Sequence, residues 1–266
     1  MHLIDAENRH LYGRELEDLF RARKQIFVDG FGWDLPLTPE GLEIDRYDDD
    51  RTQYVVGFDT QDNVVMSLRL RPADDGSILG DIFGHSLDPA VRPLTDGKTW
   101  EATRGFCLEF GRKPWNMQRK GACMAAPFEI LQAQGADRLV AFTDVRMFNW
   151  VVNMGWPMTV LGDSVHYGEG AGFALEVEIT DQVISDMRAR WDLPERSYIR
   201  IDSLEPGETV HTAAIRQALE SGFTHLLPRE DLSKLRRSIR EGESLTAGHP
   251  VPQPGQSTGI GAIAAA

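Results

Sequence analysis

The spacing of apolar residues near the start of the chain predicts an amphipathic helix. The apolar positions step along the chain by three, one and seven residues: Leu16, Leu19, Phe20 and Phe27. These steps follow one face of a helix with a period of 3.6 residues. Arg23 lies on the same face, one turn before Phe27. The pattern predicts a helix that ends near Asp29-Gly30 and turns a cation toward its own apolar side.

A period of two residues follows in the next part of the chain. "QYVVGF" (53–58) and "VVMSLRLRP" (64–72) are rich in β-branched and aromatic residues, and the polar loop "DTQDN" separates them. This pattern predicts a β-hairpin. Strand alternation places Ser67, Arg69 and Arg71 on one face, although the pattern alone leaves open that this is a polar face in contact with solvent.

The rest of the chain alternates between strand and helix patterns. Strands are predicted for 100–110, 137–143 and 173–180, and helices for 118–134 and 145–155. This order predicts a mixed sheet flanked by helices, an α/β/α sandwich. After about Trp191 the pattern changes to helical spacing in 209–223 and 231–242, followed by an end rich in Gly, Pro and Ala. We therefore expect one domain over 1–194 and a partly helical extension over 195–266, with a disordered end.

Composition narrows the function classes. The chain has 266 residues, of which 41% are hydrophobic and 26% charged, as expected for a soluble globular protein. A net charge of −13 argues against general nucleic-acid binding, which requires a basic surface. We find no run of 18 apolar residues, and therefore expect no membrane span. Cys107 and Cys123 do not make a disulfide framework, so we expect a cytoplasmic location.

Carboxylates and arginines recur in short stretches that suggest a site. "EIDRYD" carries Glu43, Asp45 and Asp48, and "WEATRG" carries Glu101 and Arg104. In a regular strand Glu101 and Arg104 fall on opposite faces. A β-bulge, for which the glycine at 105 is a suitable place, would bring both to one cleft. Taken one at a time, these residues leave open the alternatives of a solvated acidic loop and ordinary ion pairs.

Together these residues describe a pocket with charges of both signs and aromatic walls from Phe27 and Trp33. Such a pocket suits a zwitterionic ligand with an additional positive charge, because an arginine can fork onto a carboxylate and an aromatic ring can attract a cation. A further basic group precedes or begins the helix after the third strand: Lys113, Arg119 and Lys120. These cations would bind an acidic partner or a phosphopantetheine arm, with scattered solvated charges as the alternative.

The order of these residues closely resembles the acyl-homoserine-lactone synthase (LuxI-type autoinducer synthase) family. The resemblance covers roughly residues 10–185 and includes "FRARKQIFVDGFGW", "EIDRYD", "SLRLRP", "WEATRGF" and "NWVVNMGWPMTVLG". It implies a GNAT-like fold. It also implies an enzyme that joins the amine of S-adenosylmethionine to an acyl chain from acyl carrier protein or acyl-CoA, closes the lactone and releases methylthioadenosine. Where the family usually reads Ser-Arg-Phe, this chain reads Thr103-Arg104-Gly105, with Phe106 one place later.

The resemblance also implies roles for individual residues. Glu101 would be the general base, acting directly or through a water. Arg69 and Arg104 would fix carboxylates, and backbone N–H groups near 104–106 would hold the oxyanion. The implied substrate-binding residues are Arg23, Phe27, Trp33, Glu43, Asp45, Asp48, Phe106 and Thr143. The acyl pocket would include Phe142, Met147 and Trp150, and the acyl carrier would contact Lys113, Arg119 and Lys120. Adenosylmethionine is a substrate here, and neither a metal nor a cofactor is implied.

Two other functions stay open at this stage. A GNAT-type N-acyltransferase would use a thioester on another amine, and only lactone formation would release methylthioadenosine. A degenerate synthase would bind a ligand or partner through the C-terminal extension without catalysis. The sequence leaves the acyl chain length, the choice of acyl donor and the oligomeric state open.

Overall fold

A computed structural model describes residues 1–59, 61–108, 114–147, 152, 155–168, 170–193, 196–223 and 263–265. Within these residues, nine strands form one mixed sheet. In chain order the strands are β1 (His2–Ile4), β2 (Gln53–Phe58), β3 (Val64–Pro72), β4 (Thr99–Cys107), β5 (Arg138–Asp144), β6 (Met158–Val160), β7 (Val165–Tyr167), β8 (Gly170–Glu178) and β9 (Ile263–Ala265). The order across the sheet is β1-β2-β3-β4-β5-β8-β6, with β7 paired to β8 and β9 paired to β4.

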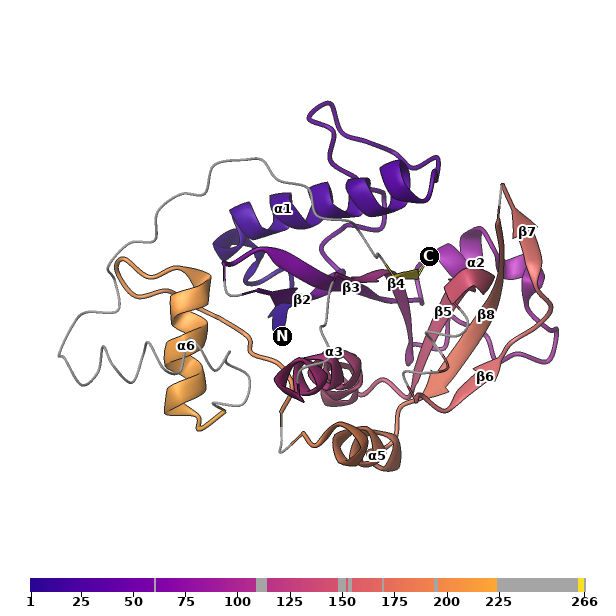
Figure 1. Ribbon diagram of the computed structural model, residues 1–266. Coiled ribbons are helices and arrows are strands. Elements are labelled where there is room, and N and C mark those ends of the chain that lie inside the picture. Colours follow the sequence, from indigo (N-terminus) through magenta and orange to yellow (C-terminus); the bar gives the residue numbers. More distant parts are fainter. Residues whose placement is uncertain are drawn as a thin grey trace.

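Helices cover both faces of this sheet. The helical segments described are α1 (Gly13–Arg23), a π-helical continuation η2 (Lys24–Gly30), α2 (Ile78–Asp81), α3 (Pro114–Ala133), α5 (Asp181–Trp191) and α6 (Val210–Glu220), with short 3₁₀ turns η1 (Arg9–Leu11), η3 (Gly84–Ser86) and η4 (Val145–Met147). Figure 1 shows α1 across β2 and β3 on one face, α3 on the opposite face and α5 beyond α3. The expected mixed α/β sandwich is confirmed.

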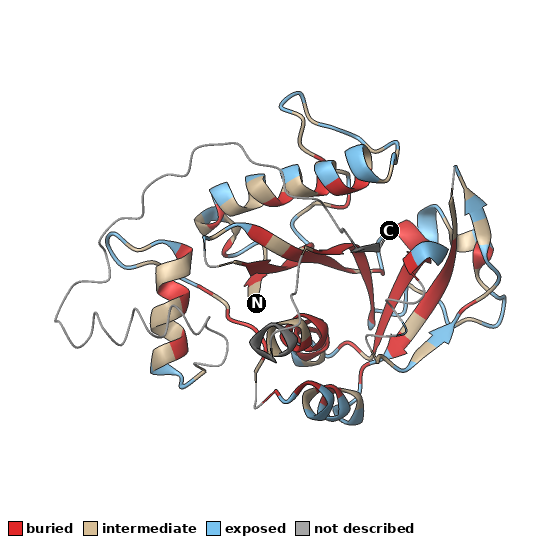
Figure 2. Ribbon diagram, viewed as in Figure 1, coloured by how far each residue is buried: buried red, intermediate tan, exposed pale blue. Residues whose placement is uncertain are grey.

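The core is divided by the sheet into separate apolar clusters. The cluster under α3 includes Met66, Leu68 and Leu70 from one face of β3. The cluster under α1 includes Phe27 and Phe106. Figure 2 shows the buried residues concentrated along the strands and on the sheet-facing sides of α1 and α3. The alternation expected for β3 is therefore present, and its polar positions are buried rather than exposed to solvent.

The N-terminal helix keeps a helical path to Gly30, as the sequence predicts, but its last part is a π-helix. A π-helical turn inside a helix often marks a functional segment. Phe27 lies in this turn and is completely buried. The turn thus presents Phe27 and the residues that follow it to the centre of the molecule.

The pairing of strand β4 and a bulge within it shape the site. It pairs in parallel with β5 at Thr99–Glu101, and it pairs with β9 farther along, at Gly105–Cys107. Between these two regions Arg104 has a φ of 53°, in the left-handed region that non-glycine residues rarely adopt, and the register between β3 and β4 shifts there. The predicted bulge is present, one residue before the glycine.

Part of the C-terminal region packs against the core of the main domain. Ile199 forms a bridge with His2 of β1 and is buried, together with Ile201. The α6 residues Val210 and Ala214 belong to the cluster under α1. The segment at Ile199 therefore adjoins the sheet at β1, and α6 packs on the cluster under α1 from the side of the sheet (Figure 1). A separate domain over 195–266 stays a prediction. The helix predicted for 231–242 and most of the 145–155 helix lie outside the described residues.

Candidate active site

Six predicted residues converge on the α1 side of the sheet and form what we call the charge cluster: Arg23, Glu43, Asp45, Asp48, Arg69 and Arg104. Arg23 from α1 donates to Glu43 through Nε and to both oxygens of Asp48, at 2.7 and 2.9 Å. Arg23, Glu43 and Asp48 are buried almost completely. The cation on the apolar face of the first helix is thus a buried ion-pair partner.

The other half of the charge cluster comes from β3 and β4. Arg69 forks onto Asp45 at 2.6 and 3.1 Å. Arg104 contacts Glu43 at 3.2 Å and Asp45 at 3.0 Å. Three guanidinium groups therefore face three carboxylates, and the formal charges of the cluster cancel. A buried network of this kind holds its members in fixed positions because an unpaired buried charge is costly.

The electrostatics of the charge cluster follow from this pairing. Burial by itself would raise the pKa of Asp48, but the guanidiniums of Arg23 and Arg69 outweigh that effect and hold the pKa below its usual range. For Arg104 burial is the largest effect, and it lowers the pKa of the guanidinium despite Glu43. Arginine side chains stay protonated in proteins, so Arg104 is charged at neutral pH.

Sequence reasoning missed two residues that complete this network. The hydroxyl of Tyr54 donates to Asp48 at 2.8 Å, and the hydroxyl of Thr103 accepts from Arg69 at 2.8 Å. Both lie opposite Arg69 on the neighbouring strands, Tyr54 on β2 and Thr103 on β4. A cross-strand register for the predicted hairpin would have identified Tyr54, because directly opposed side chains contact one another.

The carboxylate of Glu101 is buried beside the charge cluster, at the start of α2. It accepts hydrogen bonds from the backbone N–H groups of Ile78 and Leu79, at 2.8 and 2.5 Å. Burial raises the pKa of the Glu101 carboxyl to about 7, against the opposing effect of these two N–H groups and of Arg69. A carboxyl group with this pKa can accept a proton near neutral pH.

The predicted aromatic residues lie against the charge cluster. Phe27 stacks on Trp33 with ring centroids 5.1 Å apart and an interplanar angle of 15°, and it meets Phe106 edge-on at 6.4 Å. The guanidinium carbon of Arg104 lies 5.8 Å from the centre of the Phe27 ring. The buried indole N–H of Trp33 has no hydrogen-bond partner. These contacts bring the expected aromatic wall and the arginines together.

A partly enclosed cavity lies on the other side of the β4 bulge, and we call it the apolar cavity. Its volume is about 40 Å³, its lining is almost wholly apolar, and its walls come from β3, β4, α3, β5, β8 and Trp156. Gly105, Phe106 and Thr143 are among its lining residues. Phe106 thus belongs both to the aromatic wall and to the cavity, and it connects the two regions.

The other predicted residues are more dispersed. Phe142 stacks on Phe83, with centroids 3.7 Å apart, on the face of β5 away from the apolar cavity. Met147 packs in the cluster under α3. Arg119 donates to the carbonyl of Phe58. The ammonium of Lys120 lies 5.6 Å from the ring centre of Trp191 in α5. Lys113 and Trp150 lie outside the described residues.

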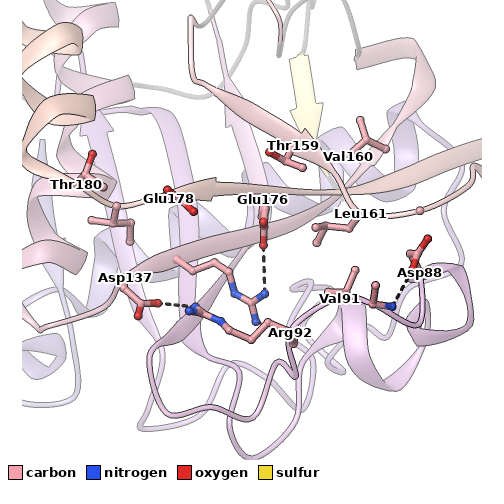
Figure 3. A pocket seen from close by; sticks show the side chains of 14 residues that line it. Asp88, Val91, Arg92, Asp137, Thr159, Val160, Leu161, Glu176, Glu178 and Thr180 are labelled. Carbon is pink, nitrogen blue, oxygen red and sulfur yellow. Dashed lines mark hydrogen bonds and ion pairs between the residues drawn. The ribbon is translucent and has the colours of Figure 1, made fainter.

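A larger open groove, of about 740 Å³, lies away from this site at the far end of β5 and β8 (Figure 3). Two ion pairs lie along it: Arg92 with Asp137 at 2.6 Å and Arg138 with Glu176 at 3.1 Å. It contains none of the charge cluster residues. Within the part of the chain that the structure describes, no group of three or more His, Cys, Asp or Glu residues is arranged to hold a metal ion, and no helix is both long and apolar enough to cross a bilayer.

Comparison with known proteins identifies the family. A family model described as autoinducer synthase matches residues 7–187. The isovaleryl-homoserine lactone synthase of Bradyrhizobium diazoefficiens is 32% identical over 196 residues, which are 73% of this chain and 86% of that protein. An acyl-homoserine-lactone synthase of Ralstonia solanacearum is 31% identical over 48% of this chain and 65% of that protein.

Solved structures agree with this assignment. BjaI, a CoA-dependent acyl-homoserine lactone synthase solved with SAM and isopentyl-CoA, has a TM-score of 0.66 and 29% identity, over 82% of this chain and 98% of that chain. MesI, another CoA-dependent acyl-homoserine lactone synthase, has a TM-score of 0.63 and 25% identity, over 74% of this chain and 97% of that chain. The resemblance read from the sequence is confirmed: this chain belongs to the autoinducer synthase family of enzymes.

Proposed function

We propose that this protein is an acyl-homoserine-lactone synthase that transfers an acyl group from acyl-CoA to the amine of S-adenosylmethionine and then closes the lactone. The observation that carries this proposal is the bulge at Arg104. It joins a charged aromatic region on one side of β4 to the apolar cavity on the other side. A polar amine and an acyl thioester approaching from these two sides meet at residues 104–106.

The charge cluster and its aromatic wall form the adenosylmethionine side of the site. Trp33 is half-buried and stacks on Phe27, which is completely buried. An aromatic face attracts a sulfonium or ammonium by a cation–π interaction. The charges of the cluster already cancel, so its residues act as a fixed framework that positions the substrate. The attraction of the sulfonium comes from the Phe27 and Trp33 rings.

Glu101 is the general base for amide formation. The substrate amine must lose a proton to attack the thioester carbon, and a carboxylate whose pKa is about 7 can take it near neutral pH, directly or through a water. The N–C bond of the amide forms, the thioester C–S bond breaks, and the proton leaves with the CoA thiol. Two N–H groups fix the carboxylate of Glu101 in one orientation.

The oxyanion of this step is held by backbone N–H groups at the β4 bulge, near Gly105 and Phe106. Electrostatic stabilisation of this kind acts without reorganisation when the donors are fixed in advance. In the second step the substrate carboxylate attacks the carbon that bears the sulfonium. The C–O bond forms as the C–S bond breaks, so the two charges cancel and methylthioadenosine leaves. Ring closure mainly requires orientation of the chain.

Acyl-CoA is the donor that the relatives support. BjaI and MesI are both CoA-dependent by their descriptions, whereas acyl carrier protein is supported by the resemblance alone. Lys120 and Arg119 near the start of α3 supply positive charge for the phosphates of CoA.

This function can be tested by incubating the purified full chain with adenosylmethionine and isovaleryl-CoA. We expect methylthioadenosine and free CoA thiol in equal amounts, together with an acyl-homoserine lactone detected by mass spectrometry. Release of thiol with another amine, without methylthioadenosine, would instead indicate the GNAT-type N-acyltransferase.

A further inference from the structure

The apolar cavity is small, and large side chains enclose most of it. Its volume is about 40 Å³, far below the roughly 300–1,000 Å³ of a typical small-molecule pocket. By this measure of volume, one water-sized group requires roughly 10–15 Å³. The cavity therefore holds about three to four groups the size of a methylene or a methyl.

The position of the cavity gives an acyl chain one direction of entry. Within the described residues, β4 and β5 pair over Thr99–Glu101, and the cavity lies where the strands no longer pair with each other. Gly105 and Thr143 line it there, and β9 pairs with β4 at Gly105–Cys107, so an acyl chain that enters between the two strands replaces β9 at this edge. An acyl group whose thioester carbon is at the bulge would therefore extend from β4 toward α3.

Two side chains on the α3 side limit how far the chain can extend. Met124 of α3 is buried and lines the cavity. Trp156 also lines it, and its ring packs edge-on against Phe128 of α3 with centroids 5.0 Å apart. Phe128 lies one helical turn after Met124, so Met124 and the Phe128–Trp156 pair close the cavity together.

We infer that this enzyme selects short acyl groups, with about three to four carbons beyond the carbonyl, and that Met124 and Trp156 are the specificity-determining residues. The inference rests on the proposed function and adds the substrate class. Protein interiors are close-packed, so a longer chain enters only if these side chains or the strands move. A single misplaced methylene typically changes kcat/KM by about 10- to 200-fold.

The test is the ranking of saturated acyl-CoA donors by kcat/KM, measured as methylthioadenosine release from butyryl-, isovaleryl-, hexanoyl-, octanoyl- and decanoyl-CoA. For the unmodified protein we expect butyryl- or isovaleryl-CoA to exceed octanoyl-CoA by at least about tenfold. A flat ranking, or a preference for octanoyl-CoA, would overturn the inference while leaving the proposed function intact. If no donor released methylthioadenosine, the proposed function would fail, and this inference with it.

Two variants should move the ranking in opposite directions. Met124→Ala enlarges the cavity, so the optimum should shift toward hexanoyl- and octanoyl-CoA. Ala141→Val, on the β5 wall, reduces the cavity and should shift the optimum toward butyryl-CoA or shorter donors. Leu131→Ala is the matched control, because Leu131 is a fully buried residue of α3 that does not line the cavity. The same shift in the control would assign the effect to general loosening of α3 and overturn the role of Met124.

Discussion

The same strands present charged side chains on one face of the sheet and apolar side chains on the other. On the α1 face, β3 and β4 present arginines to carboxylates, and every charge of the cluster has a buried partner. On the α3 face, the same two strands present Met66, Leu68 and Ala102 to the apolar cavity. Strand alternation separates ionic from apolar recognition, and one irregular residue, Arg104, lets the two regions meet.

The largest expected effect is the loss of the base on the charged side. Glu101→Gln should lower the rate of amide formation by about 10²- to 10⁴-fold, the usual contribution of a general base. The amide oxygen can still accept from one of the two backbone N–H groups of Ile78 and Leu79, while the other N–H loses its acceptor. The Phe27–Trp33 wall is not changed, so adenosylmethionine binding should be nearly unchanged. Rapid-quench kinetics and isothermal titration measure the two effects separately, and an equal loss of both would make Glu101 a binding group.

The same residue gives a pH dependence with a definite sign. Burial raises the pKa of Glu101 to about 7, and only the ionised carboxylate accepts a proton. We therefore expect kcat/KM to fall as the pH decreases below about 7, and this limb should disappear in Glu101→Gln. Because the folded state favours the protonated form, Glu101 should also reduce the free energy of unfolding as the pH rises from its ordinary pKa toward 7.

The next effect concerns the balance of the charge cluster. Glu43→Gln leaves three guanidiniums with two carboxylates, and loss of one partner in a buried ion pair typically costs about 3–5 kcal/mol of unfolding free energy. Urea denaturation measures this cost. Glu17→Gln removes an exposed α1 partner of Arg21 and serves as the control, with an expected cost of at most about 1 kcal/mol. Equal effects in both variants would contradict the structural role of the cluster.

A smaller effect is expected from the aromatic wall. Trp33→Ala removes the ring that stacks on Phe27. A cation–π contact contributes about 0.5–2 kcal/mol, so adenosylmethionine should bind about 2- to 30-fold more weakly. Trp33→Phe should retain most of the affinity. Unchanged affinity in the alanine variant, measured by isothermal titration, would remove Trp33 from the binding site.

The smallest effect concerns β9, which pairs with Gly105–Cys107, where the arm of an acyl donor would add to the edge of β4. Deletion of residues 263–266 frees this edge and should lower the KM for acyl-CoA. If the donor arm competes with β9 for the equivalent of one backbone hydrogen bond, about 0.5–1.5 kcal/mol net, the change is at most about tenfold. The KM for adenosylmethionine is the internal control. A higher acyl-CoA KM after deletion would mean that β9 supports the donor site.

Local patterns in the sequence predicted much of the fold. The hairpin of β2 and β3, the first helix and the buried strand β5 all have periodicities that depend on local residues, and α6 follows its helical spacing. The sequence did not identify β1, which has three residues and depends on pairing with β2 and on the bridge from Ile199. Such short elements are stabilised by distant partners, which single-sequence periodicity does not contain.

The site was predictable in its membership more than in its arrangement. The six charged residues singled out in the sequence do lie together in the structure, and their roles toward a substrate stay a prediction; their complete mutual pairing depends on three-dimensional geometry. The bulge was expected at Gly105 and occurs at Arg104, where the charge cluster holds a strained backbone conformation in place. Phe142 was expected in the acyl pocket, but strand alternation turns it to the opposite face from Ala141 and Thr143.

We propose that adenosylmethionine binds on the α1 face and the acyl chain on the α3 face. The most direct test is the dissociation constant of adenosylmethionine for the variant Met124→Ala. Met124 lines the cavity on the α3 side, whereas the adenosylmethionine side is built from residues on the α1 side. We therefore expect a value within about twofold of that of the unmodified protein, because substitutions at distant sites usually act independently. A weakening as large as that of Trp33→Ala would contradict the separation of the two substrates by β4.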